Sequence, residues 1–479
     1  MLLRSTLIYA PAILLTRVSA LLLLVVMTRM LSQVEYGLLT LVVTVGEMTD
    51  GAVTNWLRIA LLRLGGKGEV SRGSLVLAGR ALIAATVLAL AVAAGAATLI
   101  EPARWIEFAI AVGGYLVAGA VGRFALTVLQ MQQRHGLYSR LEYLRGVLQL
   151  VLPVAAVFLF EGSFLTVSLA SSLGALIAGI VAGVVAARRV VAGPARFTRR
   201  EFVALGGPFI VMALVGFGMN NVERLFLNAW YGAGAVAVFA ASYALARQPI
   251  DMIANAINIG AFPEIVNRFD EDGPQAAGQL LSELMALVLR LCLPVAVMLV
   301  ALSDEITRLL LPADYRGRFE LLFAIIAFSV LSANLVNFVF GVVMHAHKRP
   351  WLLIAINFLG SIGTVSLSFL LIPVLAEVGA ALALAGGSLV SLIASIVIGR
   401  RLIRVPAPWR DVAASIVIAA GTGLAAALAA RALAAAPVFA ALAAGLAAGG
   451  AGFLALVWAF HPAATALFID RLKARLPAR

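Results

Sequence analysis

The stretch that decides the fold is residues 142–189, which read EYLRGVLQLVLPVAAVFLF (142–160), EG (161–162), SFLTVSLASSLGALIAGIVAGVVAA (163–187) and RR (188–189). Both long runs are apolar over most of their length, and about 20 apolar residues are enough for a helix to cross the hydrocarbon core of a membrane. A short polar break separates the two runs, and paired arginines follow the second. The stretch therefore predicts two successive membrane-spanning helices.

The composition extends this pattern to the whole chain of 479 residues. The chain is 63% hydrophobic and 12% charged, with a mean hydropathy of +1.04, whereas soluble domains are about 45–50% apolar and about 25% charged. So little polar surface cannot cover a water-facing globule, which excludes an ordinary soluble protein. The same numbers exclude a disordered chain and a collagen. Cys292 is the only cysteine, so the chain is not a disulfide scaffold.

Apolar runs of spanning length recur along the entire sequence. We expect an all-α polytopic membrane protein with about 14 transmembrane helices, over residues 6–28, 38–62, 74–99, 105–129, 142–160, 163–187, 203–229, 232–259, 281–302, 320–344, 351–374, 377–399, 411–435 and 437–460. The first run is expected to be a retained helix, because no clear small-residue cleavage site precedes Arg17.

The basic residues indicate the orientation of these helices. A net charge of +13 would suggest nucleic acid in a soluble chain, but here most of the positive charge lies between spans. Of the 36 Lys and Arg residues, 24 fall on one side, 6 on the other and 6 within spans. Positive loops stay on the cytoplasmic side. We therefore expect both termini to be cytoplasmic and no nucleic acid to bind.

The spans also suggest two similar halves. The sequence predicts an N-terminal lobe of six helices (1–187), a basic cytoplasmic linker (188–202), a C-terminal lobe of six helices (203–401), and a last pair of helices with a basic cytoplasmic tail (402–479). A weak repeat supports the division, because Met131 and Tyr138 have the same spacing, with basic residues between, as Met344 and Trp351. Parallel repeats of this kind are common in transporters.

The loops between spans are too short to hold a catalytic domain. The larger breaks are the basic linker, an acidic loop at 260–280 and a mixed loop at 303–319. A membrane enzyme acting on a sugar or a lipid headgroup usually carries its acids, bases or metal ligands on an extended interfacial loop, so we expect no enzyme, no cofactor and no metal. His345 and His347 lie in a basic loop without a neighbouring cysteine or carboxylate, which makes a poor metal site.

Charged residues inside the spans are the informative ones, because an ionised side chain at the bilayer centre is costly and generally faces a bundle interior or a wet cavity. Six arginines lie within spans, namely Arg17, Arg58, Arg123, Arg224, Arg247 and Arg290, together with four acids, Glu47, Asp50, Glu223 and Asp251. Helical spacing aligns Glu47, Asp50, Thr54 and Arg58 on one stripe, Asn220, Arg224 and Asn228 on a second, and Arg247, Asp251, Asn255 and Asn258 on a third. We expect the first, second, seventh and eighth helices to line a common wet interior.

Two interpretations of these arginines remain open. Each arginine can be a strut neutralised by a nearby acid, as Arg247 and Asp251 at i and i+4 suggest. Alternatively, six arginines against four acids leave a positive excess inside the membrane, which favours an anionic cargo. The planar guanidinium, which stays protonated, suits a phosphate or pyrophosphate. For the neutral stripe that contains Asn334, interhelical hydrogen bonding is expected.

Several of these residues occur in a pattern typical of one family. The chain carries Arg17 in its first helix, then Thr28-Arg29-Met30-Leu31-Ser32 and Glu35-Tyr36-Gly37, then Asp50-Gly51 and Arg58, with Tyr243-Ala244 and Pro263-Glu264 around the eighth helix. This pattern and the number of spans resemble Wzx-type polysaccharide flippases of the multidrug/oligosaccharidyl-lipid/polysaccharide superfamily.

The resemblance implies a flippase of the bacterial inner membrane that carries a polyprenyl-pyrophosphate-linked oligosaccharide by alternating access between two six-helix lobes. On the analogy of the lipid II flippase, Arg17, Arg58 and Arg247 would bind the pyrophosphate, and the last two helices would hold the polyprenyl tail. The implied partners are the lipid-linked oligosaccharide, membrane lipids, and a polysaccharide polymerase with other assembly proteins around a monomer. The four acids would couple an ion or pair with arginines.

Two other functions remain as alternatives. A cation-coupled multidrug antiporter of the same superfamily usually carries an ion-coupling acid in its first helix, and this first helix has none. A polysaccharide polymerase or ligase should have a large outward loop bearing Arg and His, which the sequence lacks. The surplus of arginine favours the flippase over both alternatives.

Overall fold

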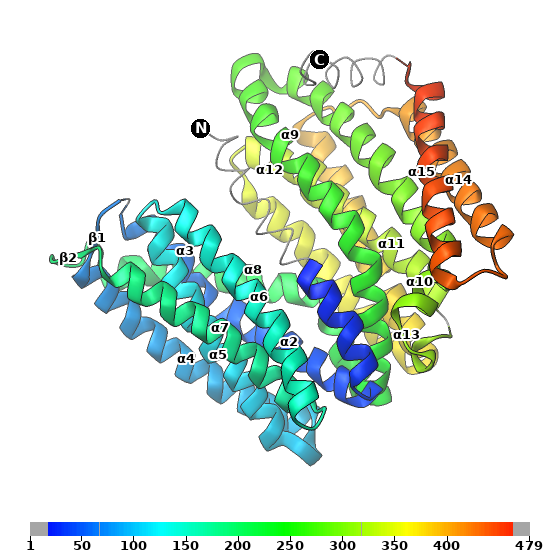
Figure 1. Ribbon diagram of the computed structural model, residues 1–479. Coiled ribbons are helices and arrows are strands. Elements are labelled where there is room, and N and C mark those ends of the chain that lie inside the picture. The colour runs from blue at the N-terminus through cyan, green and yellow to red at the C-terminus, as the bar shows by residue number, and fades with distance from the viewer. Residues whose placement is uncertain (1–17, 67, 318, 463–479) are drawn as a thin grey trace, which may run out of the picture. The chain divides into compact units, whose positions relative to one another are not determined.

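The computed structural model of the protein describes residues 18–66, 68–317 and 319–462, without the side chains of Met219 and Asn220. The described chain is almost entirely helical (Figure 1), which confirms the all-α prediction. After the first helix (Val18–Met30), its elements are α2 (Gln33–Val53), α3 (Asn55–Leu64), β1 (Val70–Ser71), α4 (Arg72–Ile100), η1 (Pro102–Arg104), α5 (Trp105–Met131), α6 (His135–Leu159), α7 (Phe164–Ala187), β2 (Val190–Val191), α8 (Arg199–Asn220), α9 (Val222–Ala301), α10 (Ser303–Leu310), η2 (Ala313–Tyr315), α11 (Phe319–Leu335), η3 (Val336–Phe340), α12 (Gly341–Ala346), α13 (Pro350–Leu402), α14 (Trp409–Ala432) and α15 (Val438–Phe460).

Ten helices of the described residues are long and apolar enough to cross a membrane. Two of them, α9 with 80 residues and α13 with 53, are far longer than the roughly 30 Å of a hydrocarbon core requires at about 1.5 Å per residue. Both are interrupted, α9 by positive φ angles at Gly232 and Gly273 and α13 by Ala376 at φ 47° and ψ −125°. Figure 1 shows α9 as several helical rods. Each predicted span overlaps a helix, the first within its described residues.

Two predicted spans are broken where the sequence suggested continuous helices. The span at 38–62 is interrupted at Thr54, where φ widens to −118°. The Thr54 hydroxyl donates to the Asp50 carbonyl at 3.1 Å. Such bonding back to the preceding turn bends helices. The span at 203–229 is interrupted at Asn221, a residue type that favours helix ends over helix interiors.

Two predicted loops contain local structure. Two acidic residues of the 303–319 loop, Asp304 and Glu305, lie in the first turn of α10, where Asp304 pairs with Arg308 at 2.8 Å. The linker at 188–202 contains β2, which pairs in parallel with β1 through Val70↔Val190 and Ser71↔Val191. The strands are too short for periodicity to reveal them. The linker ends at α8, where Thr198 and Glu201 form a capping box.

The helices belong to two compact units. Unit 1 contains residues 1–241 and 368–380. Its helices pack through small side chains, as expected where lipid provides no hydrophobic drive between helices. A Cβ added to Gly179 of α7 would lie 2.8 Å from the Gly122 Cα of α5, and α4 buries a row of alanines that includes Ala85, Ala89 and Ala93.

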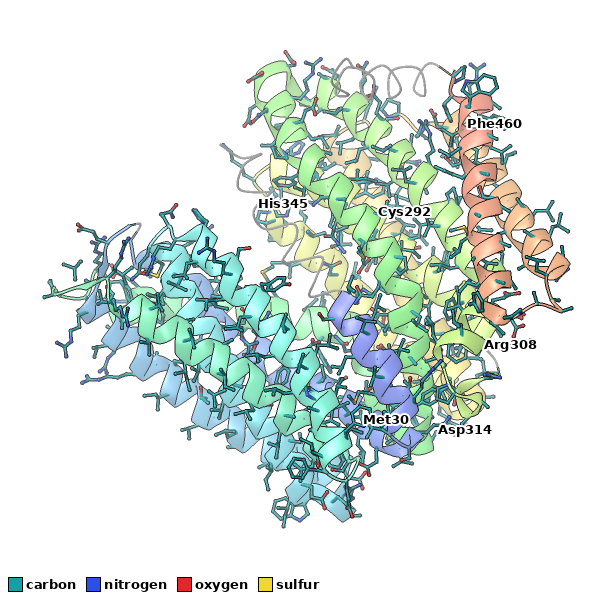
Figure 2. All side chains as sticks on the ribbon, in the orientation of Figure 1. Met30, Cys292, Arg308, Asp314, His345 and Phe460 are labelled. Carbon is teal, nitrogen blue, oxygen red and sulfur yellow. The ribbon has the colours of Figure 1, made fainter. Side chains whose placement is uncertain are left out.

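Unit 2 contains residues 242–367 and 381–479. Within it α14 and α15 lie side by side (Figure 1), and Gly445 and Gly449 of α15 face Ala426 of α14. Cys292 (labelled in Figure 2) is fully buried in this unit. His345 lies edge-on to the Phe262 ring at 5.9 Å between centroids.

Candidate functional site

The first charged group of unit 1 joins α2 to α5. The Asp50 carboxylate lies 2.5 Å from an Arg123 guanidinium nitrogen, and the Thr54 hydroxyl also donates to that carboxylate. Asp50 itself is 7% exposed. A carboxylate this far from water requires a nearby cation, so Asp50 and Arg123 neutralise each other as a pair of struts between helices.

Arg58 is the cation left over beside this pair. It lies one turn beyond Thr54, and together with Thr54 and Arg123 it lines a cavity of about 20 Å³. Among the described residues, Arg58 takes part in no ion pair or hydrogen bond. The cavity is just large enough for a water molecule, so Arg58 supplies a positive charge that no described carboxylate neutralises.

A second group of unit 1 lies at the start of α9. Arg224 donates to the Thr44 hydroxyl of α2 at 3.2 Å, and Asn228 donates to the Ile100 carbonyl at the end of α4 at 2.9 Å. Glu223 is fully buried, whereas Glu47 of α2 is exposed. Two members of one predicted stripe therefore contact neighbouring helices, Arg224 at α2 and Asn228 at the end of α4. The side chain of Asn220 lies outside the described structure, as does the whole of Arg17.

The main charged group of unit 2 is centred on Arg247 of α9. Its Nε donates to the Asp251 carboxylate at 2.7 Å, and its Nη1 donates to the Tyr243 hydroxyl. The guanidinium carbon also lies 5.3 Å from the centroid of the Tyr243 ring. The spacing predicted the pair with Asp251, and Tyr243, one turn earlier, is a partner that the same helical spacing could have revealed.

The surroundings of Asp251 hold this pair in place. The Asp251 oxygen not bonded to Arg247 accepts a hydrogen bond from Asn334 of α11 at 3.1 Å, which confirms the interhelical role expected for Asn334. Asn255 donates to the Asp251 carbonyl at 2.7 Å. The Asp251 side chain is 12% exposed, whereas that of Arg247 is 40% exposed. Asp251 is thus a buried anchor, and Arg247 presents its charge at an accessible surface. Asn258, on the predicted stripe, has a buried amide oxygen without a hydrogen-bond partner in the described structure.

Arg290 belongs to a separate group at one end of unit 2. It donates to the Asp411 carboxylate at 2.8 Å, and His461 lies 3.8 Å from the same oxygen. Burial lowers the pKa of His461, and the positive charge of Arg290 lowers it further, whereas Asp411 opposes the shift. Asp411 is the first residue of the predicted span 411–435 and is not one of the four acids predicted to lie inside spans. Its pairing removes Arg290 from the surplus of positive charge.

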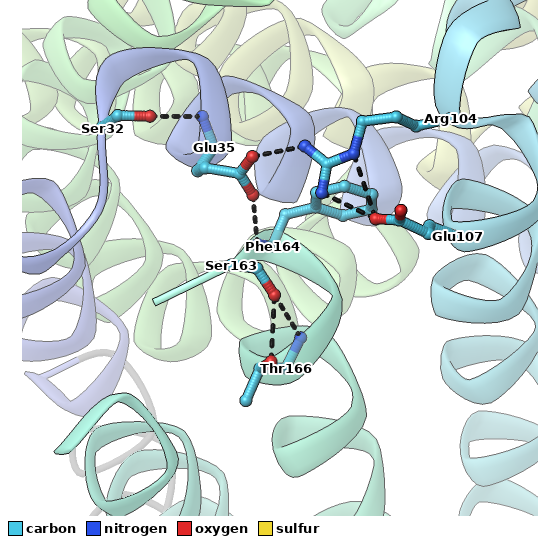
Figure 3. Close-up of polar contacts among 7 residues, drawn as sticks. All are labelled: Ser32, Glu35, Arg104, Glu107, Ser163, Phe164 and Thr166. Atoms are coloured by element: carbon cyan, nitrogen blue, oxygen red, sulfur yellow. Dashed lines mark hydrogen bonds and ion pairs between the residues drawn. The ribbon is translucent and has the colours of Figure 1, made fainter. Parts of the chain in front are cut away.

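A further ionic cluster, which the predictions of charge within spans did not include, joins three helix beginnings of unit 1 (Figure 3). Glu35 accepts hydrogen bonds from Arg104 and, at 2.7 Å, from the Phe164 backbone N–H. Arg104 also pairs with Glu107 at 2.6 Å, and its guanidinium carbon lies 4.7 Å from the centroid of the Phe164 ring. The cluster fastens the starts of α2, α5 and α7. Glu35 belongs to the Glu35-Tyr36-Gly37 motif, so one residue of that motif has a structural role in joining helices.

Known proteins resemble this chain in sequence and in fold. Residues 26–320 match the family described as polysaccharide biosynthesis protein, and residues 222–446 match the family lipid II flippase MurJ. No curated protein sequence matches the chain. The solved structure of the lipid II flippase MurJ in an inward closed conformation has a TM-score of 0.70 at 12% identity and covers 95% of this chain and 99% of that chain.

Two other solved structures share the fold more loosely. A multidrug resistance MATE family transporter of the MOP superfamily, in an inward-facing conformation, has a TM-score of 0.56 at 14% identity, over 83% of this chain and 94% of that chain. A MOP superfamily transporter from Pyrococcus furiosus has a TM-score of 0.52 at 13% identity, over 84% and 94%. At these identities the likeness establishes the fold alone. Since the first sequence family matches more than half of the residues, the chain belongs to the polysaccharide biosynthesis protein family.

Proposed function

We propose that the protein is a flippase that translocates a polyprenyl-pyrophosphate-linked oligosaccharide, such as an O-antigen, capsule or exopolysaccharide unit, across the bacterial inner membrane by alternating access. The family matches support a lipid-linked cargo, since one is named for polysaccharide biosynthesis and the other for lipid II flipping. The protein acts as a transporter and not as an enzyme.

The observation that carries the proposal is the geometry of Arg247. Its bonds to Asp251 and Tyr243 occupy two of the five N–H donors of a guanidinium. The remaining donors belong to a side chain that is still 40% exposed although it lies on an apolar helix. A fixed, accessible guanidinium that keeps free donors is suited to the oxygens of a pyrophosphate.

Arg58 is a second candidate for binding the anionic cargo. Unlike Arg123, it has no carboxylate partner in the described part of the chain, so its charge is available to an anionic ligand. We assign pyrophosphate binding to Arg17, Arg58 and Arg247. Arg123 and Arg290 act chiefly as partners of Asp50 and Asp411, and Arg224, with Asn220, Asn255 and Asn258, contributes to the polar lining.

The four acids have two proposed uses. Asp50 and Asp251 hold arginines in place, and Glu47 and Glu223 are the candidates for ion coupling. We also propose that the two lobes (1–187 and 203–401) alternate about the linker at 188–202, that α14 and α15 accommodate the polyprenyl tail, and that both termini of the monomer are cytoplasmic.

Complementation tests this function. The variants Arg58→Ala and Arg247→Ala are expressed in a strain that lacks its own copy of the gene, and surface polysaccharide and cytoplasmic-leaflet lipid-linked oligosaccharide are measured. We expect both variants to lose surface polymer and to accumulate the lipid-linked precursor. The matched control is Arg268→Ala. Arg268 also lies on α9 and pairs with an acid at i+4, Asp272, 3.1 Å away, but its side chain is 58% exposed. Normal polymer from both cavity variants at normal protein levels would contradict the proposal.

A further inference from the structure

A large groove in unit 1 lies apart from the charged groups described above. It has a volume of about 720 Å³ and lies between the first turns of α4 and α8, a size typical of small-molecule sites. Ala192, Gly193 and Ala195, which follow β2, also line the groove. This groove is much larger than the cavity beside Arg58.

Hydrogen bonds fix one end of the groove, where the start of α4 meets the segment that follows β2. The Gly73 N–H donates to the Gly193 carbonyl at 3.0 Å, and the Arg196 N–H donates to the Ser74 hydroxyl at 3.0 Å. A Cβ at Gly73 would lie 2.4 Å from the Ala195 nitrogen, so the segment 192–195 and α4 are in direct backbone contact. The pairing of β1 with β2 adjoins these bonds, so the small sheet that the sequence did not predict helps to shape the groove.

The walls of the groove are apolar and its rim is basic. The α4 wall is a single helical stripe that includes Val76, Leu77, Ala81 and Ala84, and the α8 wall is formed by Phe202 and Val203. Only 17% of the most apolar stretch of each of these two helices is buried within the protein. Both helices therefore expose apolar surface, as membrane-facing helices do.

Three arginines, Arg72, Arg80 and Arg199, line the same groove, and all three are exposed. Within the described residues, none of them has an ion-pair or hydrogen-bond partner, and no carboxylate lines the groove. Arg80 lies eight residues, or about 12 Å, into α4. Side chains on a helix lean toward its N-terminus, so Arg80 extends toward the end of the groove at which Arg72 and Arg199 begin α4 and α8.

We infer that this groove binds an anionic phospholipid, with the phosphate between Arg72, Arg80 and Arg199 and an acyl chain along α4 and α8. Charge complementarity selects the headgroup, and the apolar walls require an apolar tail, which a soluble anion lacks. Basic pockets between transmembrane helices are a recurrent site for anionic lipid headgroups. The inference does not depend on the cargo proposed above, because the groove shares no residue with the proposed pyrophosphate site.

Native mass spectrometry of the full chain in neutral detergent tests the site, with phosphatidylglycerol and phosphatidylcholine of identical acyl chains as probes. We expect the protein to retain phosphatidylglycerol in preference to phosphatidylcholine. In Arg72→Gln/Arg80→Gln the affinity for phosphatidylglycerol should fall about 25-fold, or about fivefold for each arginine. The matched control Arg188→Gln/Arg189→Gln removes two exposed arginines that lie outside the groove and should bind as the wild type does.

A second variant tests the binding of the acyl chain and separates loss of binding from loss of folding. Ala84→Trp fills the apolar part of the groove without changing its charge, and should also weaken phosphatidylglycerol binding while thermal unfolding in lipid-free detergent stays unchanged. Millimolar inorganic phosphate should not displace the lipid. Equal binding of the two lipids, unchanged binding by the Arg72/Arg80 variant, or displacement by phosphate together with an unaffected Ala84→Trp variant would overturn the inference.

Discussion

Replacing Arg247 and Asp251 singly and together separates the two roles that the arginine can have. If Arg247 only neutralises Asp251, removing both charges should restore whatever the single change destroys. If Arg247 binds a pyrophosphate, the double variant should regain stability but not transport. Arg247→Gln, Asp251→Asn and Arg247→Gln/Asp251→Asn keep the side-chain sizes similar and differ chiefly in charge.

The magnitudes follow from burial and bonding. Exposed ion pairs contribute about 0.2–1 kcal/mol, and breaking a buried pair costs about 3–5 kcal/mol. Because Arg247 is 40% exposed and Asp251 only 12%, we expect Arg247→Gln to lower the free energy of unfolding by about 2 kcal/mol. The double variant should recover most of this loss. One charge-assisted hydrogen bond to the cargo contributes about 1.5–3 kcal/mol, which corresponds to about 10- to 150-fold in affinity.

The two readouts are measured on the same variants. Thermal unfolding in detergent reports stability, and the lipid-linked oligosaccharide left on the cytoplasmic leaflet of cells reports transport. We expect Asp251→Asn to rescue the stability of Arg247→Gln while the precursor still accumulates. Transport restored to the wild-type level in the double variant would refute a binding role for Arg247 and leave it a strut.

Three further predictions concern stability. A Cβ at Gly37 would lie 1.8 Å from the Ala233 carbonyl oxygen, so Gly37→Ala should lower the free energy of unfolding by about 1–3 kcal/mol. A Cβ at Gly207 would have nothing within 4 Å. Gly207→Ala should therefore be neutral or slightly stabilising in the same thermal assay. Glu35→Gln removes the charge that holds Arg104 and should cost about 1.5–3 kcal/mol, and the exposed Glu161→Gln should have no effect; equal melting temperatures would contradict this role. The pKa of His461 is lowered in the folded state, so the unfolded chain binds the proton more readily and stability should fall as the pH drops below about 6.5. His461→Gln should flatten that part of a pH–stability curve. An unchanged curve would exclude His461 as the cause of the pH dependence.

The spans could be predicted because their cause is local. Each apolar run carries its own signal, so residues 142–160 and 163–187 were assigned correctly to α6 and α7. The interruptions at Thr54 and Asn221 could not be predicted, since each depends on one side chain or one backbone angle within an otherwise apolar run. In α9 the turn at Gly232 falls at the first residue of the predicted span 232–259, and the turn at Gly273 falls within the predicted loop at 260–280. The rest of that predicted loop is helical.

The ion pairs likewise fall into local pairs, which the sequence can suggest, and pairs between distant helices, which it cannot. Arg247 and Asp251 lie one helical turn apart, so the sequence alone suggests their contact. Arg290 and Asp411 are 121 residues apart, and only the packing of α9 against α14 brings them together. The cluster of Glu35, Arg104 and Phe164 likewise joins three helices. Charge counting found a surplus within the spans but could not identify its members, and the structure identifies Arg58 as one of them.

Proteoliposomes test most directly whether the protein moves a pyrophosphate-linked lipid by means of Arg58 and Arg247. Vesicles containing the purified protein and a fluorescent polyprenyl-pyrophosphate-linked oligosaccharide are treated with a membrane-impermeant reagent that modifies only outward-facing headgroups. The wild type should make nearly all of the lipid accessible, whereas vesicles with Arg58→Gln/Arg247→Gln should stop at about half, like protein-free vesicles. Complete accessibility with this variant, or about half with the wild type, would contradict the claim.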